Sequence, residues 1–141
     1  MDEANKARNC FISLHNSLNE IMLAEDVEIS IKEDKWEREE GGGGKTWAVS
    51  NGKWMEKGGI NFSDVRGNEL PKTATQNRPE LVGSKFRAMG VSVVFHPHSP
   101  HIPTAHANVR YFEANTPNGE KVWWFGGCLL YTSDAADDRG C

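Results

Sequence analysis

The sequence has no long apolar run. No segment approaches the roughly 20 consecutive apolar residues with which a helix crosses a bilayer. The chain begins Met-Asp-Glu-Ala-Asn-Lys and therefore lacks the basic start and the apolar stretch of a secretory signal peptide. We expect a cytoplasmic protein with no membrane span.

Cysteine is scarce, and blocks of like charge are short. The three cysteines, at positions 10, 128 and 141, do not have the spacing of a paired-cysteine zinc site. The formal net charge of -4 is spread along the chain, so neither a nucleic acid nor an anionic membrane is an expected partner. The composition instead favours a small-molecule partner.

The 141 residues fit one domain with a leading helix and a series of strands. Between about Asn5 and Leu23, apolar residues recur at spacings of three, four and seven, and this pattern predicts an amphipathic helix. Val27 to Ile31 alternates apolar and charged residues in the manner of a half-buried strand. A helix followed by strands predicts an α+β fold.

Turn signals separate the strands expected in the rest of the chain. Asn51-Gly52 stands between two short apolar runs and predicts a hairpin, and Asn115 to Gly119 has similar turn chemistry. The polar segment from Asn68 to Pro79 is predicted to be a loop, followed by a short helical turn. Because short turns join sequential strands, the sheet should be antiparallel. The expected strands are Lys45–Val49, Lys53–Glu56, Ile60–Val65, Val91–Phe95, Ala107–Ala114 and Lys121–Phe125.

The run Gly41-Gly-Gly-Gly-Lys45-Thr46 resembles a phosphate-binding loop in composition only. That loop needs a glycine five residues before Gly44, where Glu39 stands, and a helix after the Lys-Thr pair, where a strand is predicted. We therefore assign the glycines a conformational role, because they permit positive φ and a close approach of the backbone.

Four of the five histidines lie in the stretch from Ser92 to Arg110, between two strand-like runs. Alternate residues of a strand share a face, so Ser92 and His96 point to one side of the first strand. By the same rule, His106, Asn108 and Arg110 share one side of the second strand, and adjacent strands would bring all five to one cleft. Arginine binds carboxylates through a bidentate fork, and histidine transfers protons near neutral pH. The set predicts a site for an anionic substrate.

Two other interpretations of the histidines stay open. His98 and His101 lie in the proline-rich connection, where exposed loop positions are an equally good interpretation. His96 and His106 could hold a divalent metal, for which a third protein ligand is usual. The alternative is a cupin-like metal-binding protein or dioxygenase that uses His96 and His98, since Gly90 precedes His96-Pro-His98 at the cupin spacing. The glutamate that this pattern expects is absent, and a proline interrupts the pair.

Six ordered motifs together resemble one known family. They are Trp36-Glu-Arg-Glu-Glu-Gly-Gly-Gly-Gly44, Gly59-Ile-Asn-Phe-Ser63, Arg78-Pro-Glu-Leu81, Met89-Gly-Val-Ser92, the segment from His96 to Arg110 and Val122-Trp-Trp-Phe-Gly-Gly127. With them the chain closely resembles oxygen-dependent coproporphyrinogen III oxidase, a family of late enzymes of haem biosynthesis. The resemblance covers nearly all of residues 1–127.

The resemblance implies oxidative decarboxylation of two propionate groups of coproporphyrinogen III to vinyl groups. The product is protoporphyrinogen IX, O2 is the acceptor and no organic cofactor is needed. A homodimer with a large antiparallel sheet flanked by helices is implied as well. In that family's pattern His106 is the proton donor, and His96 and His106 are described as ligands of a divalent metal. The positions implied to contact substrate are Ser92, Asn108, Val109 and Arg110.

The end of the chain departs from the family after Gly127, where the family continues through another glycine into an Asp-Leu-Thr-Pro motif. Cys128 to Asp137 reads as an in-frame translation of the transposon adapter used in sequencing libraries. We therefore expect residues 1–127 to be the N-terminal part of a single domain and residues 128–141 to be a non-native tail. Such a fragment is expected to be inactive alone.

Overall fold

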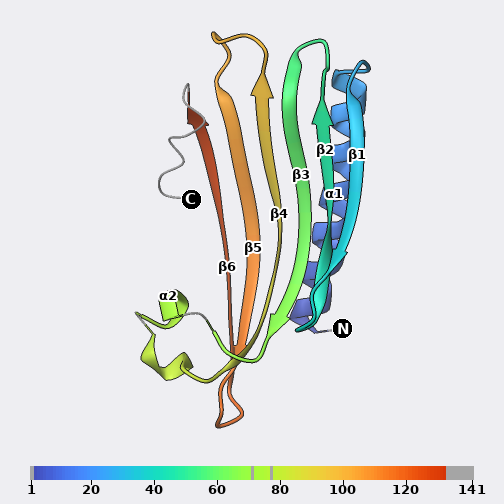
Figure 1. Ribbon diagram of the computed structural model, residues 1–141. Helices are drawn as coiled ribbons and strands as arrows, with labels where there is room; N and C mark the ends of the chain where they lie inside the picture. Colours follow the sequence, from blue (N-terminus) through green and yellow to red (C-terminus); the bar gives the residue numbers. More distant parts are fainter. Residues whose placement is uncertain (1, 71, 77, 133–141) are drawn as a thin grey trace.

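The computed structural model of the chain describes residues 2–70, 72–76 and 78–132 (Figure 1). Six strands follow one another across one sheet in sequence order, each antiparallel to its neighbours. The predicted α+β fold with a large antiparallel sheet is confirmed. The elements are α1 (Glu3–Glu25), β1 (Ser30–Glu37), β2 (Gly42–Ser50), β3 (Met55–Gly67), α2 (Lys72–Thr75), a 3-10 turn (Pro79–Leu81), β4 (Lys85–Pro97), β5 (Thr104–Asn115) and β6 (Lys121–Thr132).

Helix α1 begins at a capping residue and buries one face. The carboxylate of Asp2 accepts the backbone N–H of Asn5 at 2.9 Å, which satisfies one of the free donors at the helix start. The buried side chains of α1, including Phe11 and Met22, pack on the central strands. The helix predicted from Asn5 to Leu23 is confirmed and extends two residues further at each end. No helix in the described parts of the chain has the length and apolar character needed to cross a membrane.

Asp26, the residue after α1, joins the helix end to the β2–β3 turn. Its buried carboxylate accepts the backbone N–H groups of Lys53, Trp54 and Met55 at 2.9 to 3.0 Å. Burial raises the pKa of this carboxyl, but the hydrogen bonds outweigh burial and hold the pKa below its usual value. A Cβ at Gly52 would stand 2.3 Å from Asp26 Oδ2, so the turn closes tightly over the carboxylate.

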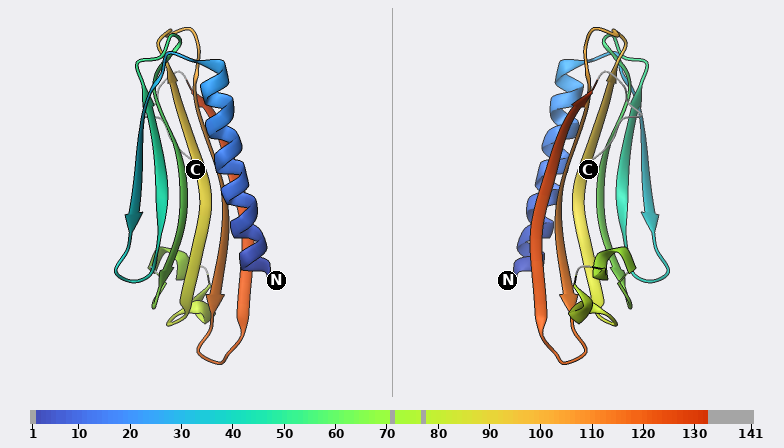
Figure 2. Two further views of the ribbon diagram at one scale, coloured as in Figure 1. Left: turned by 90° about the vertical axis from the view of Figure 1, so that its right-hand side faces the viewer. Right: turned by 90° about the vertical axis from the view of Figure 1, so that its left-hand side faces the viewer.

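The two faces of the sheet differ in what covers them. Helix α1 lies along one face, and α2 with the Pro79–Leu81 turn lies at one end of the other face (Figure 2). There Leu70 and Leu81 pack with Ala114 of β5, so the segment predicted as a loop helps to close this end of the core. The second face carries the even-numbered side chains of β4, β5 and β6. Among the described residues no further helix covers it, and we call it the open face.

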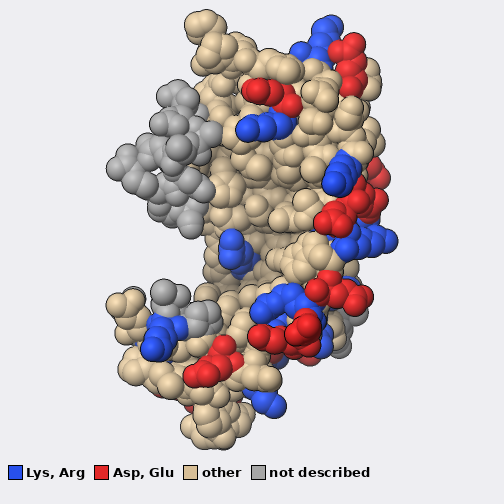
Figure 3. All heavy atoms as spheres, viewed as in Figure 1, with Lys and Arg blue, Asp and Glu red and all other residues tan. Residues whose placement is uncertain are grey.

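Charge is distributed unevenly on the open face, which is the face seen in Figure 3. Charged side chains gather along β1 and near the lower end of the molecule. The surface over the middle of β4 and β5 is largely uncharged. A ligand that reaches this part of the sheet would therefore meet few competing charges.

Two strands are predicted at Lys53–Glu56 and Ile60–Val65, with Gly58 and Gly59 between them. In the structure these glycines lie inside one strand, β3, which overlaps both predicted strands. A Cβ at Gly58 would stand 2.8 Å from the carbonyl O of Val94 on the neighbouring strand. This close approach needs glycine. The predicted division into two strands is wrong.

The boundaries of β1 and β6 also differ from the prediction. Val27, predicted to lie in a strand, is 82% exposed in a turn, and β1 starts at Ser30. β6 continues past the predicted end at Phe125 to Thr132 and stays paired with β5 throughout. Both are edge strands, whose exposed side chains weaken the hydrophobic alternation. The domain boundary after Gly127 stays a prediction, and residues 133–141 of the predicted tail lie outside the described residues.

The glycine run before Lys45 has the conformational role predicted for it. Gly41 and Gly42 have φ values of +116° and +84°, which favour glycine. A Cβ at Gly43 would stand 2.2 Å from the carbonyl O of Trp36, so β1 and β2 approach closely here. The run leads into β2 rather than a helix, as expected when the phosphate-loop interpretation is rejected.

Candidate functional site

The side chains predicted to form the site lie on the open face in rows that cross the sheet. In the first row, Asn61 of β3 stands directly opposite Ser92 of β4, and Ser92 stands opposite Asn108 of β5. Directly opposite residues of antiparallel strands point to the same face. Ser92 and Asn108 therefore share the open face, as strand parity predicts, and both are half-buried.

Arg110 lies in the next row, opposite Gly90 of β4, which in turn stands opposite Ser63 of β3. A Cβ at Gly90 would lie 3.2 Å from Arg110 Cγ and 2.3 Å from the carbonyl O of Val109. Gly90 thus leaves room for the aliphatic stem of Arg110 to lie against the sheet. Within the described residues no acidic side chain forms an ion pair with Arg110. Its exposed guanidinium can therefore receive an anion.

A shallow hollow of about 270 Å³ connects the two rows. Three of the four residues predicted to bind substrate, Ser92, Val109 and Arg110, line it together with Asn61 and Ser63, whereas Asn108 does not. The side chain of Val109 packs with the core beneath α1. Only the backbone of Val109 can therefore meet a ligand in the hollow.

The histidines predicted for catalysis and metal binding lie one row further along. His106 stands opposite Val94 on the open face, and His96 follows Val94 by two residues on the same face of β4. Such diagonal neighbours are about 7–8 Å apart. Both side chains are half-buried, and neither lines the hollow. The described residues contain no group of three or more histidine, cysteine or acidic side chains that could hold a metal ion.

The other two histidines of the segment belong to the connection between β4 and β5. His98 donates a hydrogen bond from Nε2 to the carbonyl O of Gly52 at 3.0 Å, and its backbone N–H donates to Trp54 O at 2.9 Å. His101 is exposed, and its backbone N–H donates to Ser99 Oγ at 3.2 Å. His98 thus fastens this connection to the β2–β3 turn, which gives the cupin alternative no support.

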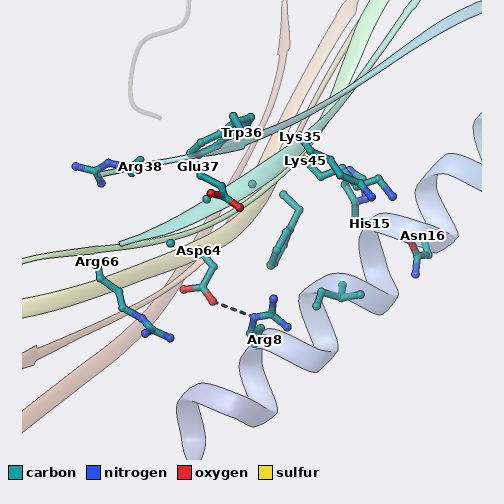
Figure 4. A pocket seen from close by; sticks show the side chains of 15 residues that line it. Arg8, His15, Asn16, Lys35, Trp36, Glu37, Arg38, Lys45, Asp64 and Arg66 are labelled. Carbon is teal, nitrogen blue, oxygen red and sulfur yellow. Dashed lines mark hydrogen bonds and ion pairs between the residues drawn. The ribbon is translucent and has the colours of Figure 1, made fainter. Parts of the chain in front are cut away.

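A larger hollow, of about 740 Å³, lies on the opposite face between α1 and the strands β1 to β3 (Figure 4). Asp64 in this hollow is held by Arg8 at 3.0 Å and by Arg87 at 2.8 Å. Lys45 in the same lining pairs with Glu33 at 2.6 Å. The lining as a whole is basic, with Arg8, Lys35, Arg38, Lys45 and Arg66 against Glu37 and Asp64, and no residue predicted for the site lines this hollow. We therefore place the candidate site in the smaller hollow on the open face.

Asn61 and Ser63 escape prediction from sequence. Their segment alternates the buried side chains of Ile60 and Phe62 with polar ones. This alternation is the signal that places Asn61 and Ser63 on the face away from the core. The identity of the neighbouring strands, which brings them to Ser92, is not contained in that pattern.

A sequence model described as coproporphyrinogen III oxidase matches residues 6–135. The match includes all the predicted site residues and runs past Gly127. It spans most of the 141 residues. The chain therefore belongs to the coproporphyrinogen III oxidase family.

Proposed function

We propose that the open face binds coproporphyrinogen III and that the complete protein converts two of its propionate groups to vinyl groups with O2 as acceptor. Membership of the family indicates a role in porphyrin biosynthesis. In the proposed reaction each propionate loses carbon dioxide and the equivalent of a hydride. The two hydrides and two protons reduce one O2 to two molecules of water, so no organic cofactor is required.

The observation that carries the proposal is the position of Arg110. Its stem lies across Gly90, its guanidinium has no acidic partner among the described residues, and Ser92 lines the same hollow. Guanidinium binds carboxylate through two parallel hydrogen bonds. A propionate carboxylate bound by Arg110 would lie next to the row of the sheet that contains Ser92 and Asn108.

The floor of the open face suits a broad ring. Gly90 and Gly126 flank Arg110 in its row, and Gly59 lies opposite Val94 in the row of His106. A Cβ at Gly126 would meet no atom within 4 Å, and one at Gly59 would meet only a methyl group of Val94, at 3.9 Å. The stem of Arg110 covers Gly90, but the lack of side chains at Gly126 and Gly59 leaves a low surface on which a macrocycle can lie.

His106 is proposed to act as the proton donor in this reaction. It shares the open face with Arg110 and lies two rows from it along β5, so a substrate anchored at Arg110 can extend toward the imidazole. Imidazole exchanges protons near neutral pH. A divalent metal would take His96 and His106 as ligands, but two imidazoles do not complete a site. We assign the metal no step in the reaction.

The test is turnover of coproporphyrinogen III by the protein in the presence of O2. His106→Ala should lower the rate of vinyl formation by about 100-fold or more, as removal of a general acid does. His101→Ala, at an exposed position of the neighbouring connection, is the matched control and should leave the rate nearly unchanged. An unchanged rate in His106→Ala would refute the role of His106, and equal turnover without O2 would refute the choice of acceptor.

A further inference from the structure

We propose that Thr46, Asn61 and Ser63 form a second carboxylate subsite on the open face. It would bind a propionate group of the same macrocycle other than the one held by Arg110. This inference rests on the proposed function, and it extends the site from β4 and β5 to β2 and β3.

The spacing of the strands separates the two subsites. Asn61 lies on β3 and Arg110 on β5, with β4 between them. Neighbouring strands are about 4.8 Å apart, so β3 and β5 are roughly 10 Å apart. Asn61 also lies one row away from Arg110. The two side chains are therefore far enough apart to bind two different carboxylates, and too far apart to favour binding the same one. A ring with several carboxylates is the class of ligand that matches this arrangement.

A contact with Thr46 gives Asn61 the polarity that a carboxylate requires. Thr46 stands directly opposite Asn61, and its hydroxyl donates to Asn61 Oδ1 at 2.5 Å. The amide oxygen is therefore occupied, and the two N–H donors of the amide group point away from Thr46. A carboxylate accepts hydrogen bonds and donates none. The orientation of Asn61 thus presents donors to an anion.

Position and surroundings also favour a ligand here. The side chain of Asn61 is exposed, Ser63 is half-buried two residues along the same face, and both line the hollow that holds Ser92. Beside Ser63 in its row, Gly44 is covered by the ring of Trp36, which would block a Cβ at a distance of 2.4 Å. The Trp36 ring therefore lies over Gly44, next to Ser63 in its row.

One acidic side chain, Asp34, stands opposite Thr46 on the open face of β1. It lies two strands from Asn61, so it is remote from the proposed carboxylate. Asp34 therefore offers a matched control. Asp34→Asn removes a negative charge from the same face without touching the donors of the subsite.

The experiment measures binding of the oxidised tetracarboxylate ring, coproporphyrin III, to the full-length protein by the fluorescence of the ring. Asn61→Asp should weaken binding by about tenfold or more, because it replaces two donors by an oxygen that carries negative charge. Thr46→Val should weaken binding by a smaller factor, since it removes the contact that orients Asn61. Asp34→Asn should not weaken binding. Far-UV circular dichroism checks that each variant is folded.

A set of four ring analogues, each with one propionate replaced by an ethyl group, assigns the carboxylates. Asn61→Ala should weaken binding of three analogues and leave the fourth unaffected, because that analogue lacks the carboxylate bound by Asn61. Arg110→Ala should also weaken binding of three analogues, but the unaffected analogue should be a different one, which lacks the carboxylate bound by Arg110. An equal loss for all four analogues, or no loss for any, would overturn the second subsite. Failure of the wild-type protein to bind the parent ring would instead overturn the proposed function itself.

Discussion

Asp64 of β3 holds Arg87 of β4 through two hydrogen bonds, from Arg87 Nε to Oδ1 at 2.9 Å and from Nη2 to Oδ2 at 2.8 Å. Arg8 of α1 donates a third, to Oδ2 at 3.0 Å. Burial raises the pKa of Asp64, but the hydrogen bonds from Arg87 and Arg8 and the charges of Arg87 and Arg66 outweigh burial and keep the pKa below its usual value. One carboxylate thus fastens α1 to two central strands.

Asp64→Asn should destabilise the protein by roughly 3 kcal/mol at pH 7, because the charge of Arg87 would stay in place without its partner. The side chain of Arg87 is only 15% exposed, so water compensates little. Urea titration gives the free energy of unfolding. Glu40→Gln, which breaks the exposed ion pair with Arg38, is the control and should cost little.

The loss caused by Asp64→Asn should depend on pH. The folded pKa of Asp64 lies below its usual value of 3.8. The stabilisation is therefore present above about pH 4 and is lost as the pH falls through the folded pKa. The gap in unfolding free energy between wild type and variant should shrink in acid. A gap that stays constant from pH 7 to pH 3 would contradict this assignment.

Gly90→Ala should destabilise the protein by about 1–3 kcal/mol, the usual cost of an added methyl group in a filled space. The new Cβ would stand 2.3 Å from Val109 O and 3.2 Å from Arg110 Cγ. Gly126→Ala is the matched control, because Gly126 stands on the other side of Arg110 and its Cβ would meet no atom within 4 Å. Thermal unfolding measures the stability of both variants. An equal loss of stability in Gly90→Ala and Gly126→Ala would show that space at Gly90 is not limiting.

His15 should make the protein less stable as the pH falls below 6.5. It is buried, and its Nε2 donates to the carbonyl O of Ile60 at 3.0 Å. Burial lowers the pKa of His15 and outweighs the opposing effect of this hydrogen bond. The unfolded chain therefore binds a proton more readily than the folded protein. As the pH falls from 6.5 toward the folded pKa, the free energy of unfolding decreases by at most about 1.4 kcal/mol per pH unit. In His15→Gln the decline between pH 7 and pH 5 should be shallower, and an identical decline would rule this out.

Tyr111 should ionise late in an absorbance titration. Burial raises its pKa to about 12, and the charge of Glu113 adds to the effect. Because the folded pKa is above the usual value of 10.0, the related stability is present below pH 10 and is lost as the pH rises toward 12. Tyr111→Phe should remove one phenolate signal above pH 11. Loss of a signal near pH 10 instead would contradict the burial of this phenol.

Strand periodicity predicts the open face well. Alternation alone places Ser92 with His96 and Asn108 with Arg110, because successive side chains of a strand point to opposite faces. The proline-rich segment between them is too short for any other connection than a turn, so β4 and β5 become neighbours. These two facts suffice for the β4–β5 half of the candidate site.

The β2–β3 half could not be predicted in the same way. Gly58 and Gly59 have the composition of a strand break, and only their contact with β4 shows why glycine continues the strand there. The row that joins Asn61 to Ser92 depends on the register between two strands separated by a long segment. Register arises from tertiary packing, which local periodicity does not contain. Asp26 was missed for the same reason, since its partners lie beyond β2.

The order of the strands has a consequence for how the chain acquires its structure. Each strand pairs only with the strands before and after it in sequence, and such local pairing favours rapid folding. During synthesis the β1–β2 and β2–β3 hairpins can close as soon as they emerge. Helix α1 is made first, yet it packs on β3, β4 and β5. Its apolar stripe therefore stays only partly covered until β5 has been translated, and in that interval a chaperone can bind the part that is still exposed.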